Sequence, residues 1–260
     1  MNQSDYLKTL KLAKRTLEEY ENWGEDELYK TPVQKSSSET MSNQSNKIIK
    51  GDKVTLNELR NRVTNCKDCA LGATRLTAVF GEGSPTAEIM FVGEGPGFDE
   101  DHQGRPFIGK AGQFLTNLIE LMGYSRDTVY IANIVKCHPM KDPSNPELRG
   151  NDRPPTDLEV SQCCKYLEAQ IAAINPKVIV TLGKPSARYF LKTDAAMGAL
   201  RGNFHDYNGI KLMPTYHPSY LIRNGCVFGK KDQGPEINKL KKEVWTDLKK
   251  VMNYIKTGNV

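Results

Sequence analysis

Short apolar runs alternate along the chain with longer segments in which apolar residues recur every three or four positions. Short runs bounded by turn residues are typical of buried strands, and the longer spacing is typical of amphipathic helices. Strands are expected at residues 87–92, 129–135, 177–182 and 210–213, with an edge strand at 77–80. Helices are expected at residues 55–63, from Lys110 onward, at 156–175, from about Pro185 onward and at 237–255. This alternation predicts an α/β fold, a three-layer α/β/α domain around a central, mostly parallel sheet.

The first fifth of the chain has a different pattern. Residues 5–29 carry apolar positions compatible with a short helix, whereas residues 36–46 are polar and nearly free of apolar side chains. Such a segment buries too little surface to order itself and predicts a flexible linker. We therefore expect an N-terminal helix and linker in residues 1–52 and a globular domain in residues 53–260.

Composition narrows the class of protein. The 260 residues are 38% hydrophobic and 26% charged, which suits one globular domain with a tail. There is no apolar run of membrane-spanning length, and the first residues lack the apolar centre of a signal peptide. The sequence therefore predicts a soluble cytoplasmic protein, expected to be a monomer. Its net charge of +5 is compatible with an acidic partner such as nucleic acid.

Chemistry-bearing residues gather after the first long strand. Gly93, Gly95 and Gly97 form a turn whose backbone can lie flat against a ligand because it carries no Cβ atoms. Three carboxylates and an aromatic residue follow: Asp99, Glu100, Asp101 and Phe107. We expect the strand to deliver the turn, the carboxylates and the ring to one pocket for a flat polar ligand.

A generic nucleotide site is the plainer alternative for this turn. The third glycine comes too early for the dinucleotide fingerprint, and no helix is expected directly after it. The Lys and Ser/Thr of a phosphate-binding loop are absent from the turn, and the dense carboxylates would repel phosphate. The sequence therefore disfavours a generic nucleotide site.

Six cysteines without a secretory signal indicate reduced thiols or a metal site rather than disulfides. Cys66 and Cys69 form a Cys-x-x-Cys turn, which suits one metal centre and also suits redox chemistry. Farther along, Asn133 lies near the end of a predicted strand, where ligands gather in open α/β sheets.

Three stretches together resemble the family 4 uracil-DNA glycosylases, the iron–sulfur type. Gly93-Glu-Gly-Pro-Gly97, with the carboxylates and the 104–109 segment after it, is similar to the first motif of that family. Asn133-Ile-Val-Lys-Cys137 is similar to the second, and the run from Thr215 to Arg223 is similar to the terminal, His-containing motif. The resemblance covers residues 55–251 and leaves out the N-terminal tail.

The resemblance implies a [4Fe–4S] cluster on Cys66, Cys69, Cys137 and Cys163, since such a cluster takes four thiolates. Cys164 and Cys226 are then ordinary thiols. Residue chemistry alone leaves a four-cysteine zinc site open. The loop at residues 140–155 is longer than is usual in the family.

The resemblance also implies hydrolysis of the bond between uracil and deoxyribose in DNA, with the base flipped out of the duplex. Phe107 would stack on uracil, and Asn133 would offer an acceptor and donors to its N3–H and O4. His217, with the backbone N–H groups available in the turn Glu94-Gly95-Pro96-Gly97, would bind O2 as negative charge develops there. Each residue also has an ordinary structural interpretation: a core Phe, a turn-capping Asn and a loop His.

The water-activating group is not supplied by the motif. In the best-known glycosylase family an Asp occupies the third place of the first motif, where this chain has Gly95. Glu94 and Glu100 are the carboxylates available to activate the water, and Glu100 is favoured. Its alternative role is to shape the pocket so that the methyl group of thymine is excluded.

DNA contacts are expected from the segment that follows His217. Leu221 or Ile222 would wedge into the vacated base stack, as apolar side chains do in kinked DNA. Arg223, Lys230 and Lys231 would meet phosphates. A different class of protein is also compatible with these residues, namely a cluster-bearing module that binds DNA without cleaving it. A covalent variant of the enzyme is disfavoured because residues 140–155 contain no His.

Overall fold

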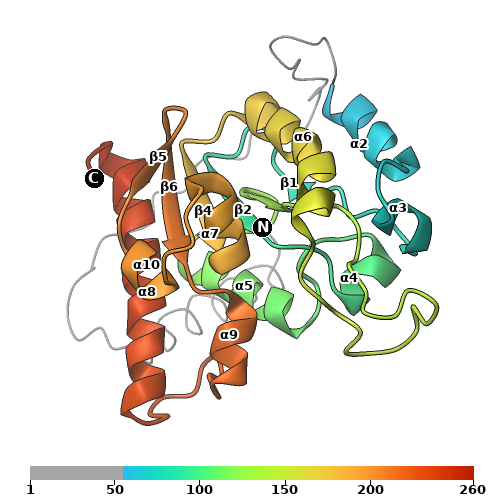
Figure 1. Cartoon of the computed structure of the whole chain (residues 1–260). Helices are drawn as coiled ribbons and strands as arrows, with labels where there is room; N and C mark the ends of the chain where they lie inside the picture. The colour runs from blue at the N-terminus through green and yellow to red at the C-terminus, as the bar shows by residue number, and fades with distance from the viewer. Residues whose placement is uncertain (1–54) are drawn as a thin grey trace, which may run out of the picture.

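The structure is a computed structural model that describes residues 55–260 (Figure 1). The helix and linker expected within residues 1–52 lie outside the described residues. Six strands form one sheet in the order β1-β3-β2-β4-β6-β5. They are β1 (Glu82–Gly83), β2 (Ile89–Gly93), β3 (Tyr130–Asn133), β4 (Val178–Leu182), β5 (His205–Tyr207) and β6 (Ile210–Thr215). The four central strands are parallel and the two edge strands are antiparallel, which confirms the predicted α/β class.

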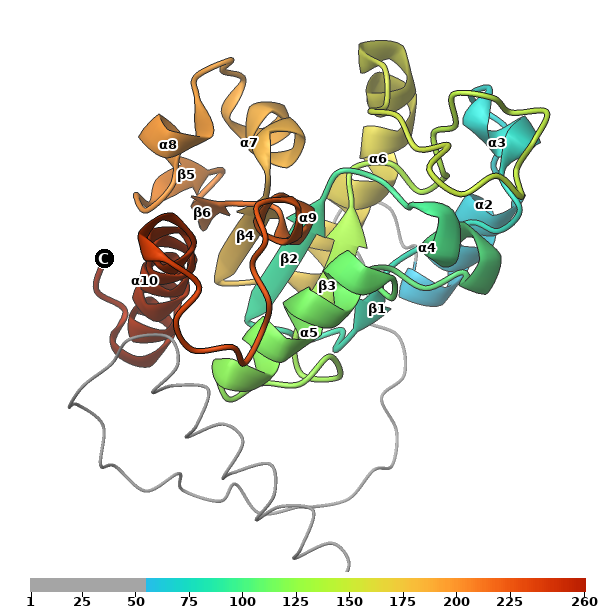
Figure 2. The same cartoon turned by 90° about the horizontal axis from the view of Figure 1, so that it is seen from below.

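Helices cover both faces of the sheet (Figure 2). The helices of the described chain are α2 (Leu56–Asn65), α3 (Leu71–Thr74), α4 (Phe98–Gln103), α5 (Lys110–Leu121), α6 (Asp157–Ile174), α7 (Lys184–Leu191), α8 (Met197–Leu200), α9 (Pro218–Arg223) and α10 (Pro235–Thr257). Helices α5, α9 and α10 pack on one face and α6 and α7 on the other, while α2 packs against α6. None of these helices has the length and apolar composition needed to cross a bilayer.

Alternation along the buried strands creates a separate core on each face. In β2, Ile89 and Phe91 belong to the cluster under α5 and α10, whereas Met90 and Val92 belong to the cluster under α6 and α7. Successive side chains of a strand point to opposite faces, so a strand covered on both sides needs a continuous apolar run. The expected Thr156–Glu159 capping box is present: each side chain accepts the backbone N–H of the other residue.

The edge strands differ from the prediction. Residues 77–80 are irregular in the structure, so the edge strand expected there is wrong; the edge strand is β1, two residues long and paired with β3. Strand β5 was not expected, although Asn208-Gly209 between β5 and β6 is a hairpin signal in the sequence. Both residues have positive φ, 53° and 85°, as a tight hairpin turn requires. Short polar strands lack the apolar run by which buried strands are recognised.

Helix α4 begins directly after the glycine turn, so the expectation that no helix opens there is wrong. Gly97 has no side chain with which to cap the helix, and Glu100 accepts the Gly97 N–H at 3.2 Å instead. Asp101 on this helix is fully buried and accepts the N–H groups of Leu76 and Thr77 at 3.1 Å. The expectation that all three carboxylates reach the pocket is therefore wrong for Asp101.

Leu221 on α9 is fully buried in the core beneath α5 and α10. This burial contradicts its expected role as a wedge in DNA, because a side chain packed in the core cannot enter a base stack without leaving it. The exposed aromatic residue on the same helix is Tyr220, and Ile222 is partly buried.

We predict that Leu221→Ala lowers the free energy of unfolding by about 2–5 kcal/mol, because it removes buried methyl groups from a packed core. The matched control is Leu158→Ala on α6, a leucine that is 67% exposed, which should change stability by less than about 0.5 kcal/mol. Urea unfolding followed by circular dichroism measures both. Equal stability of the two variants would contradict the packing of α9.

Candidate active site and cysteine centre

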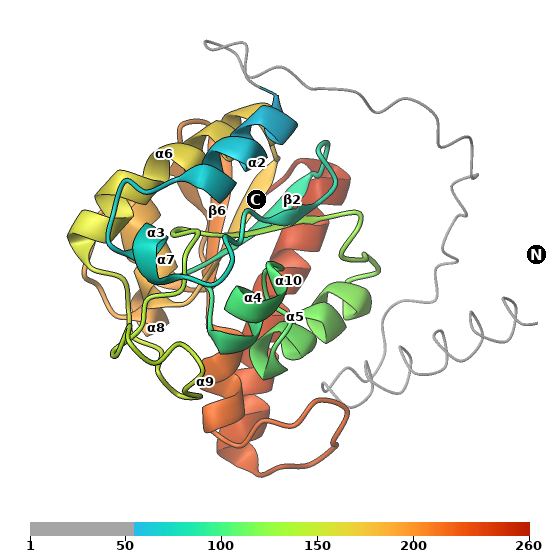
Figure 3. The same cartoon turned by 90° about the vertical axis from the view of Figure 1, so that its right-hand side faces the viewer.

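A cavity of about 580 Å³ opens at the carboxyl ends of the parallel strands. Its walls come from the turn after β2, the end of β3, the loop that follows β3 and the first residues of α9. Figure 3 shows α4, α9 and the loop between β3 and α6 gathered at one end of the molecule. Parallel strands point their carboxyl ends to one edge, so segments far apart in sequence meet there.

Phe107, Asn133 and His217 all line this cavity. The rings of Phe107 and His217 lie 5.7 Å apart between centroids, with their planes inclined by 35°. Gly93 lies beneath the ring and the amide: a Cβ on residue 93 would come within 2.3 Å of Phe107 Cζ and 2.5 Å of Asn133 Oδ1. The space between the ring and the amide therefore exists because residue 93 has no side chain.

The amide oxygen of Asn133 is buried and has no hydrogen-bond partner among the described residues. An unsatisfied buried acceptor costs about 1–3 kcal/mol, so natural structures rarely keep one without a reason. Because Asn133 lines the cavity, a ligand that carries an N–H group can satisfy this oxygen.

Phe107 is held in a backbone conformation that non-glycine residues seldom adopt, with φ of 51°. Arg126 donates from Nη1 to the Phe107 carbonyl at 2.9 Å and from Nε to Glu82 at 2.7 Å. Local strain of this kind is maintained by surrounding contacts and concentrates at ligand sites. The ring is thus fixed in position before any ligand arrives.

His217 presents a defined tautomer to the cavity. The backbone N–H of Ser219 donates to Nδ1 at 3.1 Å, so Nδ1 is an acceptor and the proton of the neutral ring is on Nε2. The Ser219 hydroxyl lies 2.8 Å from the same nitrogen and accepts from Arg223 at 2.9 Å. Burial, assisted by the charge of Arg223, lowers the pKa of His217 to about 4, so the ring stays neutral at neutral pH.

The contacts of Glu100 give it a structural task. Oε1 accepts the N–H groups of Ile108 and Gly109 at 2.9 and 3.0 Å, and Oε2 accepts that of Gly97. The carboxylate thereby ties the glycine turn to the segment that carries Phe107. Backbone donors occupy both oxygens, which does not favour the water-activating role expected for Glu100.

The remaining residues of the glycine turn line the cavity with little freedom. A Cβ on Gly95 would come within 2.9 Å of Val135 Cγ2, so this position has no room for the Asp of the best-known family. Pro96 is buried, and the Gly97 N–H is taken by Glu100, so it is not available to bind a ligand oxygen as expected. Burial raises the pKa of Glu94, which favours its neutral form.

The candidate DNA-binding residues divide into two groups. Arg223 is exposed and lines the cavity. Lys230 and Lys231 are exposed in the loop before α10 and do not line the cavity. Their contact with phosphates stays a prediction.

The loop between β3 and α6 carries cavity residues that the sequence did not single out: Arg149 and Asp152. Arg149 lies over the ring of Phe98 at 4.3 Å and pairs with Asp99 at 3.1 Å. Asp152 Oδ1 lies 2.6 Å from Nε2 of the buried His138. No motif marks residues in a Pro-rich loop; Ser219, by contrast, was detectable as a hydroxyl two residues after His217.

The four predicted cluster ligands come together at a second, smaller cavity. Cys66, Cys69, Cys137 and Cys163 line it. Arg75 donates to Cys137 Sγ at 2.8 Å, and the Lys136 N–H donates to Cys163 Sγ at 3.3 Å. Cys164 bonds to the Ser161 carbonyl, and Cys226 lies in the core. None of the six cysteines, all of which lie within residues 55–260, forms a disulfide in the structure.

We predict that His217 titrates near pH 4, well below its ordinary value of 6.5. Because the folded-state pKa is depressed, the neutral ring with its proton on Nε2 persists from alkaline pH down to about pH 5. Nitrogen-15 NMR of labelled histidine measures both the titration and the tautomer. Ser219→Ala keeps the backbone donor and should keep the tautomer. A His217 titration near pH 6.5, or a proton on Nδ1, would contradict the geometry.

Comparison with known proteins shows the family to which the chain belongs. A family model described as the uracil DNA glycosylase superfamily matches residues 80–249. The type-4 uracil-DNA glycosylase of Thermotoga maritima is 41% identical over 197 residues, which cover 75% of this chain and 92% of that protein. The type-4 enzyme of Sulfurisphaera tokodaii is 41% identical, over 65% of this chain and 77% of that protein. That of Saccharolobus solfataricus is 38% identical, over 76% of this chain and 87% of that protein. The chain therefore belongs to the uracil DNA glycosylase superfamily and, within it, to the type-4 uracil-DNA glycosylases.

Proposed function

We propose that this protein hydrolyses the N-glycosidic bond of uracil in DNA, releasing uracil and leaving an abasic site. The observation that carries the proposal is the amide oxygen of Asn133, which has no partner in the described part of the chain and lies in a cavity shared with Phe107 and His217. The names of the relatives support the same activity.

Hydrogen-bond polarity explains the choice of base. Uracil offers an N3–H donor to Asn133 Oδ1 and an O4 acceptor to the amide nitrogen. Cytosine reverses both groups and would leave the buried oxygen unsatisfied, at a cost of about 1–3 kcal/mol. Phe107, already fixed in place, gives the flipped base an aromatic face on which to stack.

His217 stabilises the departing base. As the C1′–N1 bond breaks, the bonding electrons move onto uracil and negative charge develops at O2. The Nε2–H of a neutral imidazole donates a hydrogen bond there, and a fixed donor in a water-poor cavity is worth several kcal/mol in such a step. Ser219 and Arg223 maintain the required tautomer through Nδ1.

The DNA backbone approaches the rim of the cavity. Lys110, Arg149 and Arg223 line it, and the chain carries a net charge of +5. We include Lys230 and Lys231 as more distant phosphate contacts, which act through charge alone. We further propose that residues 53–260 form the catalytic domain and that it acts as a monomer in the cytoplasm.

The cysteine centre fits an iron–sulfur cluster. Cys66, Cys69, Cys137 and Cys163 line one cavity, and four thiolates are the ligand set that a [4Fe–4S] cluster takes. Four cysteines can also hold zinc, but the resemblance of the chain to the iron–sulfur type of uracil-DNA glycosylase favours the cluster. When bound, the cluster would cross-link the α2–α3 segment, the end of β3 and α6.

The test of the function is release of uracil from a labelled oligonucleotide, followed by alkali and gel electrophoresis. Strand scission shows glycosylase activity; an intact shifted band shows binding without cleavage, and a heat-stable shift shows a covalent adduct. Either of the last two outcomes, without scission, rejects the proposal.

We predict that Gly93→Ala lowers the excision rate by at least about 100-fold, because the added methyl group displaces Phe107 and Asn133. Gly198→Ala on α8 is the matched control: a Cβ there meets nothing within 4 Å, and the rate should stay that of the unaltered protein. Equal rates for the two variants would show that the ring and the amide do not form the base pocket.

For the cysteine centre, we predict about four iron and four sulfide per chain, with visible absorption that is lost in Cys163→Ser. Cys164→Ser is the matched control, because Cys164 does not line the cysteine cavity and its loss should leave iron content unchanged. Stoichiometric zinc with no iron would contradict the assignment.

A further inference from the structure

Four carboxylates line the main cavity: Glu94, Asp99, Glu100 and Asp152. If the chain is a uracil-DNA glycosylase, as proposed above, a group on this wall must take the proton of the attacking water and face the cationic sugar. The contacts of each carboxylate decide which one is suited to that task.

The contacts or burial of three of the four carboxylates make them less suited to this role. Both oxygens of Glu100 accept backbone N–H groups that hold the pocket together. Asp99 is paired with Arg149, a permanent cation, at 3.1 Å, whereas Asp152 shares a single imidazole, that of His138, with the buried Asp101. Glu94 is partly buried, and burial raises its pKa, so its charged form is less favoured than that of an exposed carboxylate.

Asp152, by contrast, is exposed and ionised. Its side chain is 56% exposed, and Oδ1 lies 3.6 Å from the position that a Cβ on Gly97 would occupy, so it stands beside the glycine turn. The hydrogen bond from His138, aided by a backbone bond from Phe98, lowers its pKa and keeps it ionised. An anionic carboxylate beside the reacting carbon is what glycoside hydrolysis generally employs.

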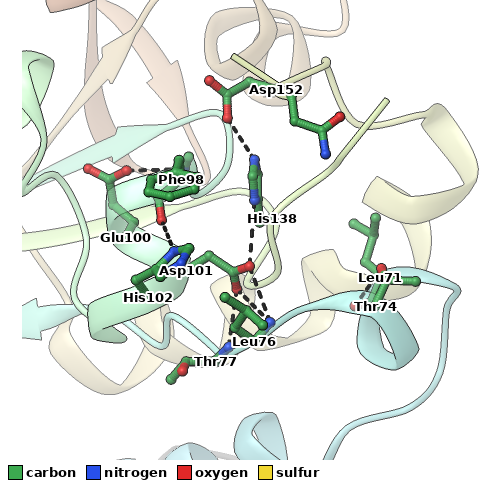
Figure 4. Close-up of polar contacts among 12 residues, drawn as sticks. Leu71, Thr74, Leu76, Thr77, Phe98, Glu100, Asp101, His102, His138 and Asp152 are labelled. Atoms are coloured by element: carbon green, nitrogen blue, oxygen red, sulfur yellow. Dashed lines mark hydrogen bonds and ion pairs between the residues drawn. The ribbon is translucent and has the colours of Figure 1, made fainter. Parts of the chain in front are cut away.

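The Asp152 carboxylate is contacted by His138, which lies between Asp152 and Asp101 (Figure 4). His138 is almost fully buried, with Nε2 2.6 Å from Asp152 and Nδ1 3.5 Å from the buried Asp101. His138 is thus held between two carboxylates, which fixes the ring nitrogen that faces Asp152.

The backbone around Asp152 is fixed as well. Asp152 forms an isolated bridge with Met140, and the Arg153 N–H donates to the Pro139 carbonyl at 3.0 Å. A reacting group on a loop needs such support, because catalysis demands placement within fractions of an ångström.

We propose that Asp152 is the catalytic carboxylate that activates the attacking water, and that His138 and Asp101 are the residues that position it. The water oxygen forms a bond to C1′ while the C1′–N1 bond breaks and its electron pair leaves with uracil. The water proton passes to Asp152, which returns it to solvent after the product departs. Before that transfer, the negative charge of Asp152 stabilises the positive charge on the sugar.

The test combines two variants of the intact, cluster-bearing protein. Asp152→Asn keeps the shape and an acceptor for His138 but removes the charge, and should lower the single-turnover excision rate by about 100-fold or more. Its affinity for DNA that contains a non-cleavable 2′-fluorinated deoxyuridine should stay within about threefold of the unaltered protein. Asp152→Ala should recover part of its lost rate when formate supplies the missing carboxylate, a response that a purely structural role would not give. Asp194→Asn, at a carboxylate that is 77% exposed and does not line the cavity, should keep its rate and show no formate response.

Two results would overturn the assignment: an unimpaired rate in Asp152→Asn, or an Asp152→Ala variant that formate does not accelerate. Visible absorption and thermal melting of each variant verify that the cluster and the fold persist. If the unaltered protein releases no uracil, the proposed function fails rather than the role of Asp152. If it releases uracil and Asp152→Asn does so equally fast, only the role of Asp152 fails.

Discussion

The site depends on a space that no side-chain atom can occupy. At residue 93 a methyl group would overlap both the ring of Phe107 and the amide of Asn133, two groups that arrive from different strands and loops. Around this point, Arg126 and Glu100 hold the Phe107 segment in a strained backbone conformation. Strand β3 delivers the amide oxygen of Asn133, which has no hydrogen-bond partner within residues 55–260. The fold thus keeps a strained backbone and an unsatisfied hydrogen-bond acceptor at one place. A flat base with an N–H donor can bind there and satisfy the acceptor.

The same polar network joins this pocket to the cysteine centre. Asp101, on the helix that follows the glycine turn, binds the backbone of Leu76 and Thr77, and the neighbouring Arg75 donates to Cys137 Sγ. His138, next to Cys137 in the chain, contacts Asp101 on one side and Asp152 on the other (Figure 4). The segments that carry the cysteines therefore also support the cavity wall. A cluster bound to these cysteines would stabilise that wall.

The sequence predicted those features of the fold and the site that depend on short stretches of residues. The four central strands, the Thr156–Glu159 cap and the convergence of Phe107, Asn133 and His217 at one edge follow from apolar runs, capping residues and strand-end placement. Helix α4 was missed because Glu100, three residues into the helix, replaces the missing cap of Gly97. The burial of Leu221, the engagement of Glu100 and the place of Asp152 depend on contacts between residues far apart in the chain, which no short pattern records.

The most direct measurement of the central claim is a crystal structure with DNA that contains a non-cleavable deoxyuridine analogue. The account predicts uracil stacked on Phe107, its N3–H within hydrogen-bond distance of Asn133 Oδ1 and its O2 facing His217 Nε2. A flipped uracil bound elsewhere, with the Asn133 oxygen still unpartnered, would contradict it.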